Sequence, residues 1–103
     1  MTGFIEQHID RLKVLCRKHS VVQLEVFGSA AGGKQFDPVA SDIDFLVKFT
    51  QLSASDHAKA YFGLLADLQD LFKTSIDLVE ITAVTNPYFL ESLNKTRTEI
   101  YAA

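Results

Sequence analysis

The chain has little of what would direct it out of the cell or into a membrane. Its 103 residues include one cysteine, Cys16, so no disulfide can form within the chain, and a reducing, cytoplasmic compartment is expected. No apolar run approaches the roughly 20 residues that span a bilayer. Glu6 and Asp10 interrupt the N-terminal segment, so we expect neither a secretory signal peptide nor a membrane association.

Basic residues and prolines are also few. Ten Lys and Arg residues stand against 13 Asp and Glu residues, giving a net charge of −3, and the basic residues are scattered along the chain. Because a protein that grips a polyanion usually presents a basic face, we expect no stable DNA or RNA binding. Two prolines and a hydrophobic fraction of 48% indicate a packed globule, and the length predicts a single domain over residues 1–103.

The hydrophobic pattern predicts a small α+β sandwich. Its period favours a helix over residues 4–19, strands over 21–27, 42–49 and 75–81, and a loop over 28–41 with one helical turn after Ser29. A second helix is expected to open at Ser53, and a third at Asn86-Pro87. The second helix has an apolar stripe of Ala58, Tyr61, Phe62, Leu65, Leu68 and Phe72; the third has a buried side of Phe89, Leu90, Leu93 and Ile100. A helix between the last two strands predicts that they run parallel if they are neighbours.

Two aspartates open the second predicted strand on one of its faces. Side chains alternate across a strand, so Asp42 and Asp44 share a face with Leu46 and Lys48. The opposite face is uniformly apolar and is expected to pack against helices, leaving the acids outward: Ile43, Phe45, Val47 and Phe49. Like charges this close raise each other's pKa unless a cation lies between them, and Mg²⁺ binds carboxylates together with substrate phosphates. The pair indicates a metal site, unless Asp42 caps a turn and Asp44 is a solvated strand residue.

Two further features fit the same site. Gly28 directly after a strand allows close backbone approach to a ligand, and free N–H groups of a helical turn at Ser29 suit a phosphate, although an ordinary turn has the same residues. Asp77 lies within the apolar run 76–79, where a charge has no evident structural role. Glu80 is the competing third acid, but it points to the opposite face from Asp77.

These residues resemble the signature of the nucleotidyltransferase superfamily that shares the DNA polymerase β palm fold. That signature is a hydrophobic residue and Gly-Ser, a spacer of about a dozen residues, then Asp-hydrophobic-Asp, and a carboxylate on a later strand. The corresponding residues here are Phe27-Gly28-Ser29, twelve spacer residues, Asp42-Ile43-Asp44 and Asp77. The resemblance implies a small mixed sheet packed against helices.

The short chain is most similar to the minimal nucleotidyltransferases, many of which are antitoxins of a helical HEPN-domain RNase toxin. The resemblance implies transfer of AMP from ATP to a tyrosine of the toxin, with two Mg²⁺ ions. It implies metal binding by Asp42, Asp44 and Asp77, proton acceptance by Asp77, and binding of the β- and γ-phosphates by Gly28 and Ser29.

One position departs from the resemblance. Many minimal members have an arginine directly after Gly-Ser, whereas here Ala30 and Ala31 follow, and an alanine cannot hold phosphate oxygens as a guanidinium does. Lys34 or Lys48 would have to compensate. The alternatives are an antitoxin that acts by contact alone with a degenerate site, and transfer to a small molecule, which generally needs a further substrate domain.

The remaining histidines and the cysteine are expected to have no catalytic or metal-binding role. The histidines lack metal-ligand spacing and are expected at the surface or at helix ends: His8, His19 and His57. Cys16 is expected in the core. An aromatic patch for a partner is expected from Tyr61, Tyr88 and Phe89.

Overall fold

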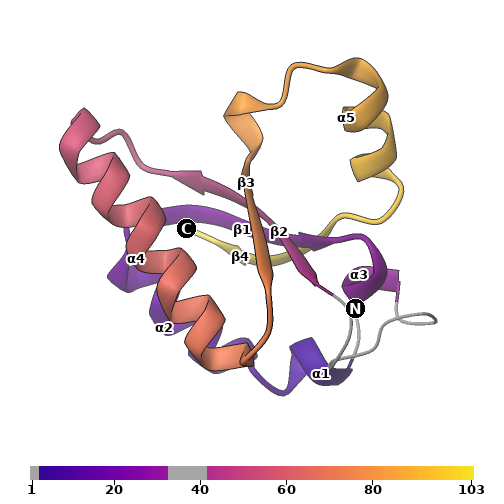
Figure 1. Ribbon diagram of the computed structural model, residues 1–103, viewed down its shortest axis with the longest axis horizontal. Helices are drawn as coiled ribbons and strands as arrows, with labels where there is room; N and C mark the ends of the chain where they lie inside the picture. Colours follow the sequence, from indigo (N-terminus) through magenta and orange to yellow (C-terminus); the bar gives the residue numbers. More distant parts are fainter. Residues whose placement is uncertain (1–2, 33–41) are drawn as a thin grey trace.

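The computed structural model describes residues 3–32 and 42–103 (Figure 1). Its elements, in chain order, are α1 (Gly3–Glu6), α2 (Ile9–Lys18), β1 (Val21–Phe27), α3 (Ser29–Gly32), β2 (Ile43–Phe49), α4 (Ala54–Phe72), β3 (Ile76–Glu80), the 3₁₀ helix η1 (Ile81–Ala83), α5 (Pro87–Asn94) and β4 (Thr98–Ala102). The helical turn predicted after Ser29 is present as α3. The rest of the predicted loop, including Lys34, lies outside the described residues.

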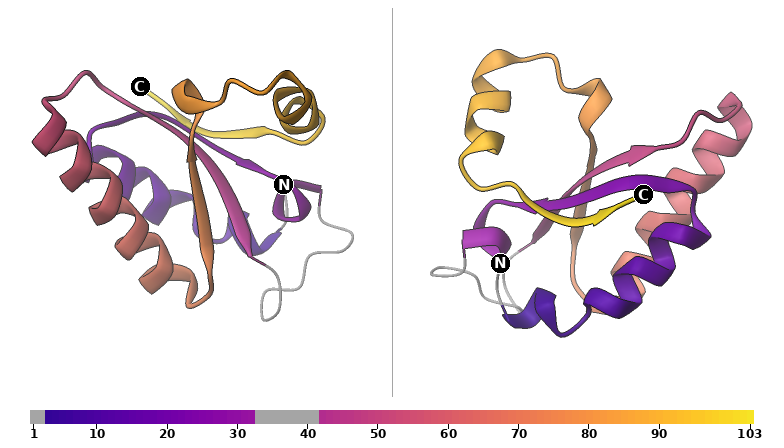
Figure 2. Two further views of the ribbon diagram at one scale, coloured as in Figure 1. Left: turned by 45° about the horizontal axis from the view of Figure 1, so that its top comes forward. Right: turned by 180° about the vertical axis from the view of Figure 1, so that it is seen from behind.

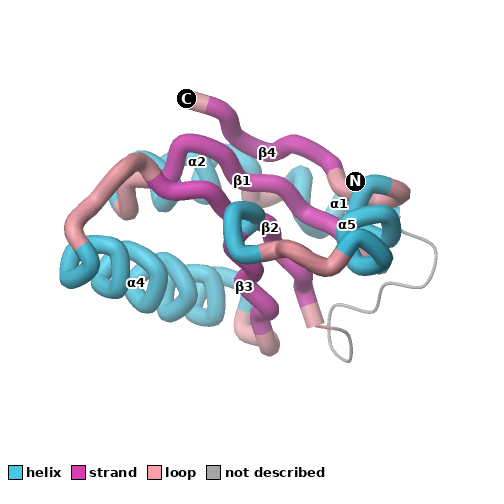
Figure 3. Tube along the Cα trace, turned by 90° about the horizontal axis from the view of Figure 1, so that it is seen from above, coloured by secondary structure: helices cyan, strands magenta, loops and turns pink. Residues whose placement is uncertain are grey.

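The sheet is mixed and has the order β3-β2-β1-β4 (Figure 3). β1 pairs antiparallel with both β2 and β4. β2 and β3 are neighbours and run parallel, which confirms the expectation from the helix that connects them. The register of this parallel pair sets Asp44 opposite Asp77.

Helices cover the two faces of the sheet unequally (Figures 1 and 2). α2 and α4 lie against one face, where Leu12, Cys16, Leu64 and Leu68 are fully buried in one cluster. The predicted inward face of β2 joins this cluster with all four of its apolar residues, Ile43, Phe45, Val47 and Phe49. α5 lies on the other face, over a smaller cluster of three buried side chains, Phe27, Leu46 and Leu93.

The first predicted helix is interrupted. Residues 4–19 form two helices with a turn at Gln7 and His8, where the His8 ring donates a hydrogen bond to the Phe4 carbonyl at 2.9 Å. His8 therefore ends one helix and precedes the next. Cys16 is fully buried in the main core, as expected.

The long helix begins as predicted but is rotated relative to the expected stripe. Ser53 is its N-cap and accepts a hydrogen bond from the Asp56 backbone N–H at 3.2 Å. Its buried residues follow a spacing of four: Ala60, Leu64, Leu68 and Phe72. The prediction was wrong for Ala58 and Phe62, which are exposed, Phe62 by 65%. The buried stripe is narrower than the sequence predicts because the sheet and α2 contact only one narrow side of the helix.

The C-terminal segment is where the prediction fails most. Ile100 was expected on the last helix, but α5 ends at Asn94, and Ile100 lies in β4, buried in the main core. Asn86 is the N-cap of α5 and accepts hydrogen bonds from the Tyr88 and Phe89 N–H groups. Phe89 and Leu90, expected to be buried, are exposed by 40% and 37%. Within the described part of the chain, no helix is long and apolar enough to cross a bilayer.

Candidate active site

Three of the predicted site residues gather at one end of the β2–β3 pair. Asp44 in β2 is the register partner of Asp77 in β3, so the two acids occupy neighbouring positions on the sheet. Both lie on the face away from α2 and α4, since the residues that flank Asp44 pack into the main core. Asp42 is exposed and directly precedes β2, which begins one residue later than predicted.

The electrostatics of this end centre on Asp44. Its side chain is partly buried, and this burial together with the charges of Asp77 and Asp42 raises the pKa of the Asp44 carboxyl from 3.8 to about 6. The repulsion that the sequence predicts therefore contributes to the raised pKa of Asp44. A cation held between these carboxylates would relieve it.

Gly28 lies against the same carboxylate. Its φ angle is +73°, a left-handed conformation that glycine adopts readily, and a Cβ placed on it would come within 2.7 Å of the Asp44 Oδ2 atom. Only a residue without a side chain fits between the end of β1 and the acid. Gly28 thus brings its backbone to Asp44, whereas the approach expected from the sequence was to a ligand.

The Gly28 peptide is fixed on both sides. Its carbonyl accepts the Ala31 N–H at 3.1 Å, which closes the turn of α3 that begins at Ser29. Its N–H donates to the Thr96 Oγ1 at 2.9 Å, from the segment between α5 and β4. Thr96 was not predicted as a site residue. It is 68 positions from Gly28, and nothing in the local sequence marks this contact.

The outward face beside the acids is covered farther along β2. Leu46 was expected to face outward beside the aspartates, and it does lie on their face, but it is buried under α5 with Phe27 and Leu93. Lys48, two positions beyond, is exposed. The acids therefore lie between the small buried cluster of Phe27, Leu46 and Leu93 and the solvent.

A metal ion would be held here by carboxylate oxygens. Over residues 3–32 and 42–103, no three His, Cys, Asp or Glu side chains lie close enough to hold one ion as a preformed set. The donors nevertheless fit a hard divalent cation: Asp44 and Asp77 lie side by side, Asp42 lies two residues before Asp44, and burial together with the charges of the other two acids raises the pKa of the Asp44 carboxyl.

The competing acid, Glu80, is engaged elsewhere. Its carboxylate lies 2.5 Å from the His57 Nε2 atom at the start of α4, on the face of the sheet opposite the aspartates. The preference for Asp77 over Glu80 as the acid near Asp44 agrees with this placement.

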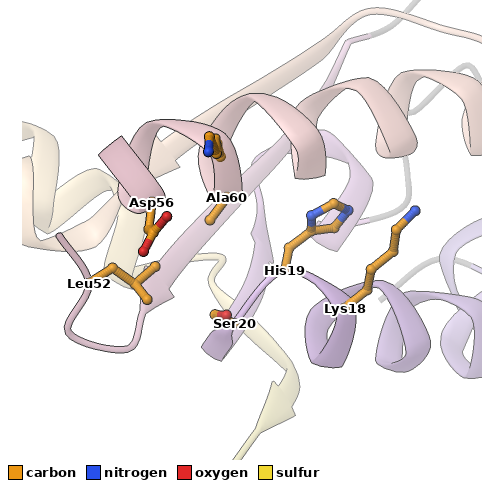
Figure 4. A pocket seen from close by; sticks show the side chains of 7 residues that line it. Lys18, His19, Ser20, Leu52, Asp56 and Ala60 are labelled. Atoms are coloured by element: carbon orange, nitrogen blue, oxygen red, sulfur yellow. The ribbon is translucent and has the colours of Figure 1, made fainter. Parts of the chain in front are cut away.

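A surface cavity of about 310 Å³ lies away from the acids, between the end of α2 and the start of α4 (Figure 4). It is lined by Lys18, His19, Ser20, Leu52, Asp56, Lys59 and Ala60. His19, which ends α2, bonds to Asp67 of α4 at 2.6 Å, and Lys18 joins the same carboxylate at 3.0 Å. Gly63 leaves space for the His19 ring, since a Cβ there would lie 2.8 Å from its Cε1 atom. These contacts join two helices, and none of the predicted site residues lines the cavity.

The protein has a nucleotidyltransferase fold, a small mixed four-stranded sheet with helices, and two of its strands carry the acids. Residues 10–103 match the family described as "Polymerase beta, Nucleotidyltransferase". The chain belongs to this family, and within it has the minimal nucleotidyltransferase domain.

Two relatives from one organism match most of this chain. Over 83 residues the chain is 37% identical to the "Putative protein adenylyltransferase MJ0128" of Methanocaldococcus jannaschii, covering 81% of this chain and 80% of that protein. A second protein of the same organism, the "Putative protein adenylyltransferase MJ1379", is 30% identical over the same length.

Solved structures share the fold. One described as a "putative minimal nucleotidyltransferase" superposes with a TM-score of 0.65 at 26% identity, over 91% of this chain and 90% of that one. A chain of a toxin–antitoxin structure with AMP-PNP gives 0.68 at 19% identity, over 92% and 73%. A chain of a structure of tri-AMPylated Shewanella oneidensis HEPN toxin in complex with MNT antitoxin gives 0.64 at 17%, over 95% and 72%. At these identities the last two likenesses show the fold alone.

Proposed function

We propose that this protein is a Mg²⁺-dependent protein adenylyltransferase that transfers AMP from ATP to a tyrosine hydroxyl of a HEPN-type toxin and thereby acts as its antitoxin. The observation that carries the proposal is the pairing of Asp44 with Asp77 across two parallel strands, with the Gly28 backbone against Asp44. Membership of the nucleotidyltransferase family and the relative named as a protein adenylyltransferase support it.

The first task of the site is to hold the nucleotide. Asp42 and Asp44 would be the main ligands of two Mg²⁺ ions, with Asp77 completing the set. When bound, magnesium would neutralise the triphosphate and stabilise the entering and leaving oxygens. Gly28 and Ser29 would position the β- and γ-phosphates: Ser29 through its backbone N–H and its hydroxyl, and Gly28 through the turn that it opens, since its own N–H donates to Thr96. Gly28 suits this role because the absence of a Cβ lets the Asp44 carboxylate lie directly against the turn that follows β1.

The second task is proton transfer. The tyrosine oxygen attacks the α-phosphorus, the bond between the α- and β-phosphates breaks, and pyrophosphate leaves with the bonding electrons. The tyrosine proton passes to the Asp77 carboxylate, which is exposed and therefore accessible to an acceptor. Most of the acceleration would come from positioning and charge neutralisation rather than from covalent chemistry.

A partner protein would supply the acceptor. Tyr88 and Phe89 at the start of α5 are exposed by 82% and 40%, and the Phe89 ring contacts Phe27, the register partner of Asp44. This exposed aromatic surface near the acids supports a protein acceptor. Tyr61, expected in the same patch, is not part of it, because its hydroxyl donates to the Leu78 carbonyl on the other side of β3.

The test is intact-mass measurement of a HEPN-type protein encoded beside this chain, after co-expression and after incubation with ATP and Mg²⁺. We expect the partner to gain the mass of one or more AMP groups, and Asp77→Asn to abolish the gain. Asp70→Asn is the matched control, since Asp70 is an exposed acid on α4 that pairs with Lys73. A partner modified equally by the Asp77 variant would refute the assigned role.

Nucleotide binding gives a second test without a partner. We expect calorimetry to detect ATP binding only with a divalent ion, because the acids would otherwise repel the triphosphate. Tight binding in EDTA would contradict the assigned role of the acids.

The second candidate is an antitoxin that acts by contact alone. It is favoured by one observation, the absence of an arginine after Gly28-Ser29, where Ala30 and Ala31 are buried. A complex that inhibits the toxin with no mass change under any metal or nucleotide would support it. Failure to bind any partner would favour a small-molecule acceptor instead.

A further inference from the structure

Thr96 connects the C-terminal segment to the candidate active site. Its hydroxyl oxygen accepts the Gly28 N–H at 2.9 Å, although the two residues are 68 positions apart. Gly28 in turn lies against the Asp44 carboxylate, closely enough that a Cβ would collide with Oδ2. The Gly28 peptide is therefore held between an acid on one side and a threonine hydroxyl on the other.

Thr96 is itself held firmly in place. Its N–H donates to the Leu93 carbonyl at 3.1 Å, and the side chain of Leu93, a residue of α5, is fully buried. The next residue, Arg97, forms two hydrogen bonds of 2.6 and 2.7 Å to Glu25, whose side chain is buried in β1. Thr96 is thus held by α5 through its own N–H and by β1 through the adjacent Arg97.

The hydrogen bond also decides the conformation of Gly28. A glycine explores positive and negative φ angles about equally, so its φ of +73° needs an external partner to be the single populated state. The Thr96 hydroxyl and the closing bond from the Ala31 N–H supply two such constraints. Without the first, the peptide between β1 and α3 keeps only the local one.

We propose that Thr96 is a positioning residue of the nucleotidyl-transfer site, whose hydroxyl fixes the Gly28 peptide against Asp44, at the start of the turn that would hold the phosphates. This inference rests on the proposed function, in which the turn at Gly28 and Ser29 positions the phosphates and Asp44 binds metal. Thr96 acts through Gly28 and has no assigned contact with the substrate.

The test compares three variants with the wild type. Thr96→Val keeps the shape and removes the acceptor oxygen, and Thr96→Ser keeps the oxygen. Thr98→Val is the matched control, because the Thr98 hydroxyl donates to the Thr96 carbonyl and leaves the acceptor of Gly28 in place. Affinity for Mg²⁺·AMP-PNP is measured by calorimetry, and amide hydrogen exchange of Gly28 by NMR reports the hydrogen bond itself.

We expect Thr96→Val to weaken Mg²⁺·AMP-PNP binding about tenfold, as the loss of one hydrogen bond at a fixed site predicts, and to speed exchange of the Gly28 amide. Thr96→Ser should restore both, and Thr98→Val should bind as the wild type does. Unchanged affinity in Thr96→Val overturns the inference, as does equal loss in Thr98→Val or no recovery in Thr96→Ser. A wild type that binds no nucleotide overturns the proposed function itself, and the inference with it.

Discussion

Replacing Asp44 with asparagine should stabilise the metal-free protein at neutral pH. The folded protein raises the pKa of this carboxyl from 3.8 to about 6, through burial and the charges of Asp77 and Asp42. A folded pKa above the unfolded value means that folding favours the protonated form. The contribution of this carboxyl to stability is therefore greatest below about pH 4, falls as the pH rises toward 6, and stays reduced above that.

The magnitude follows from the shift. About two pKa units correspond to about 3 kcal/mol at full effect. Because Asp44 is only partly buried, solvent screens much of this, and we expect about 1–2 kcal/mol. Asparagine has nearly the same shape and no charge, so Asp44→Asn should unfold about 5–10 °C higher than the wild type at pH 7.5 in EDTA. At pH 4 the two proteins should melt within about 2 °C of each other.

The assay is thermal unfolding at both pH values, with and without Mg²⁺. Magnesium should raise the melting temperature of the wild type and leave that of Asp44→Asn nearly unchanged, because the variant lacks a ligand. Asp70→Asn, at an exposed acid on α4, controls for the general loss of one negative charge. An Asp44→Asn protein that is less stable than the wild type at pH 7.5 in EDTA would refute the reasoning and make the aspartate structural.

Three further predictions concern the scaffold. Gly63→Ala should lower stability by about 1–2 kcal/mol in urea denaturation, because the new Cβ meets the His19 ring at 2.8 Å; in a His19→Ala background the same change should be stabilising through helix propensity, and an equal loss in both would contradict this. Arg97→Met should cost about 3–5 kcal/mol by leaving Glu25 buried without its partner, and adding Glu25→Gln should recover part of that loss if the cost arises from the stranded charge. Burial raises the pKa of the Cys16 thiol to about 12, so a thiol reagent at pH 8 should label it only at the rate of unfolding; rapid labelling of the native protein would show that the thiol is accessible.

Much of the site could be predicted because it depends on short-range rules. Strand alternation alone places Asp42 and Asp44 on the face opposite the apolar residues of β2. The crossover helix predicts a parallel β3, and Asp77 is the only acid of that strand on the same face. Gly28 after a strand marks a close approach, and the structure identifies the approached group as the Asp44 carboxylate.

What could not be predicted depends on long-range packing. The last helix was predicted to extend over β4 because Ile100 was counted with its apolar side, although the alternation of β-branched Thr96, Thr98 and Ile100 is the signal of a strand. Leu46 was placed on the correct face but in the wrong environment, because α5 folds back over it from about 40 residues later. The contact between Thr96 and Gly28 could not be predicted, because β4 and the position of α5 over Leu46 were not predicted and no local pattern marks the contact.

Under the proposed function, the in-register pairing of β2 with β3 would also make activity depend on correct strand alignment. A slip of β3 by one residue would still allow a parallel ladder of hydrogen bonds, but it would turn Asp77 toward α4 and bring Ile76 or Leu78 beside Asp44. A slip of two residues would keep the face and move the acid by about 6.6 Å along the strand, out of range of its neighbour. Only the observed register sets Asp77 beside Asp44, so a misaligned copy of this chain would lose the proposed site. Selection for activity therefore also selects for strand alignment, at a parallel edge where hydrogen bonding alone specifies it weakly.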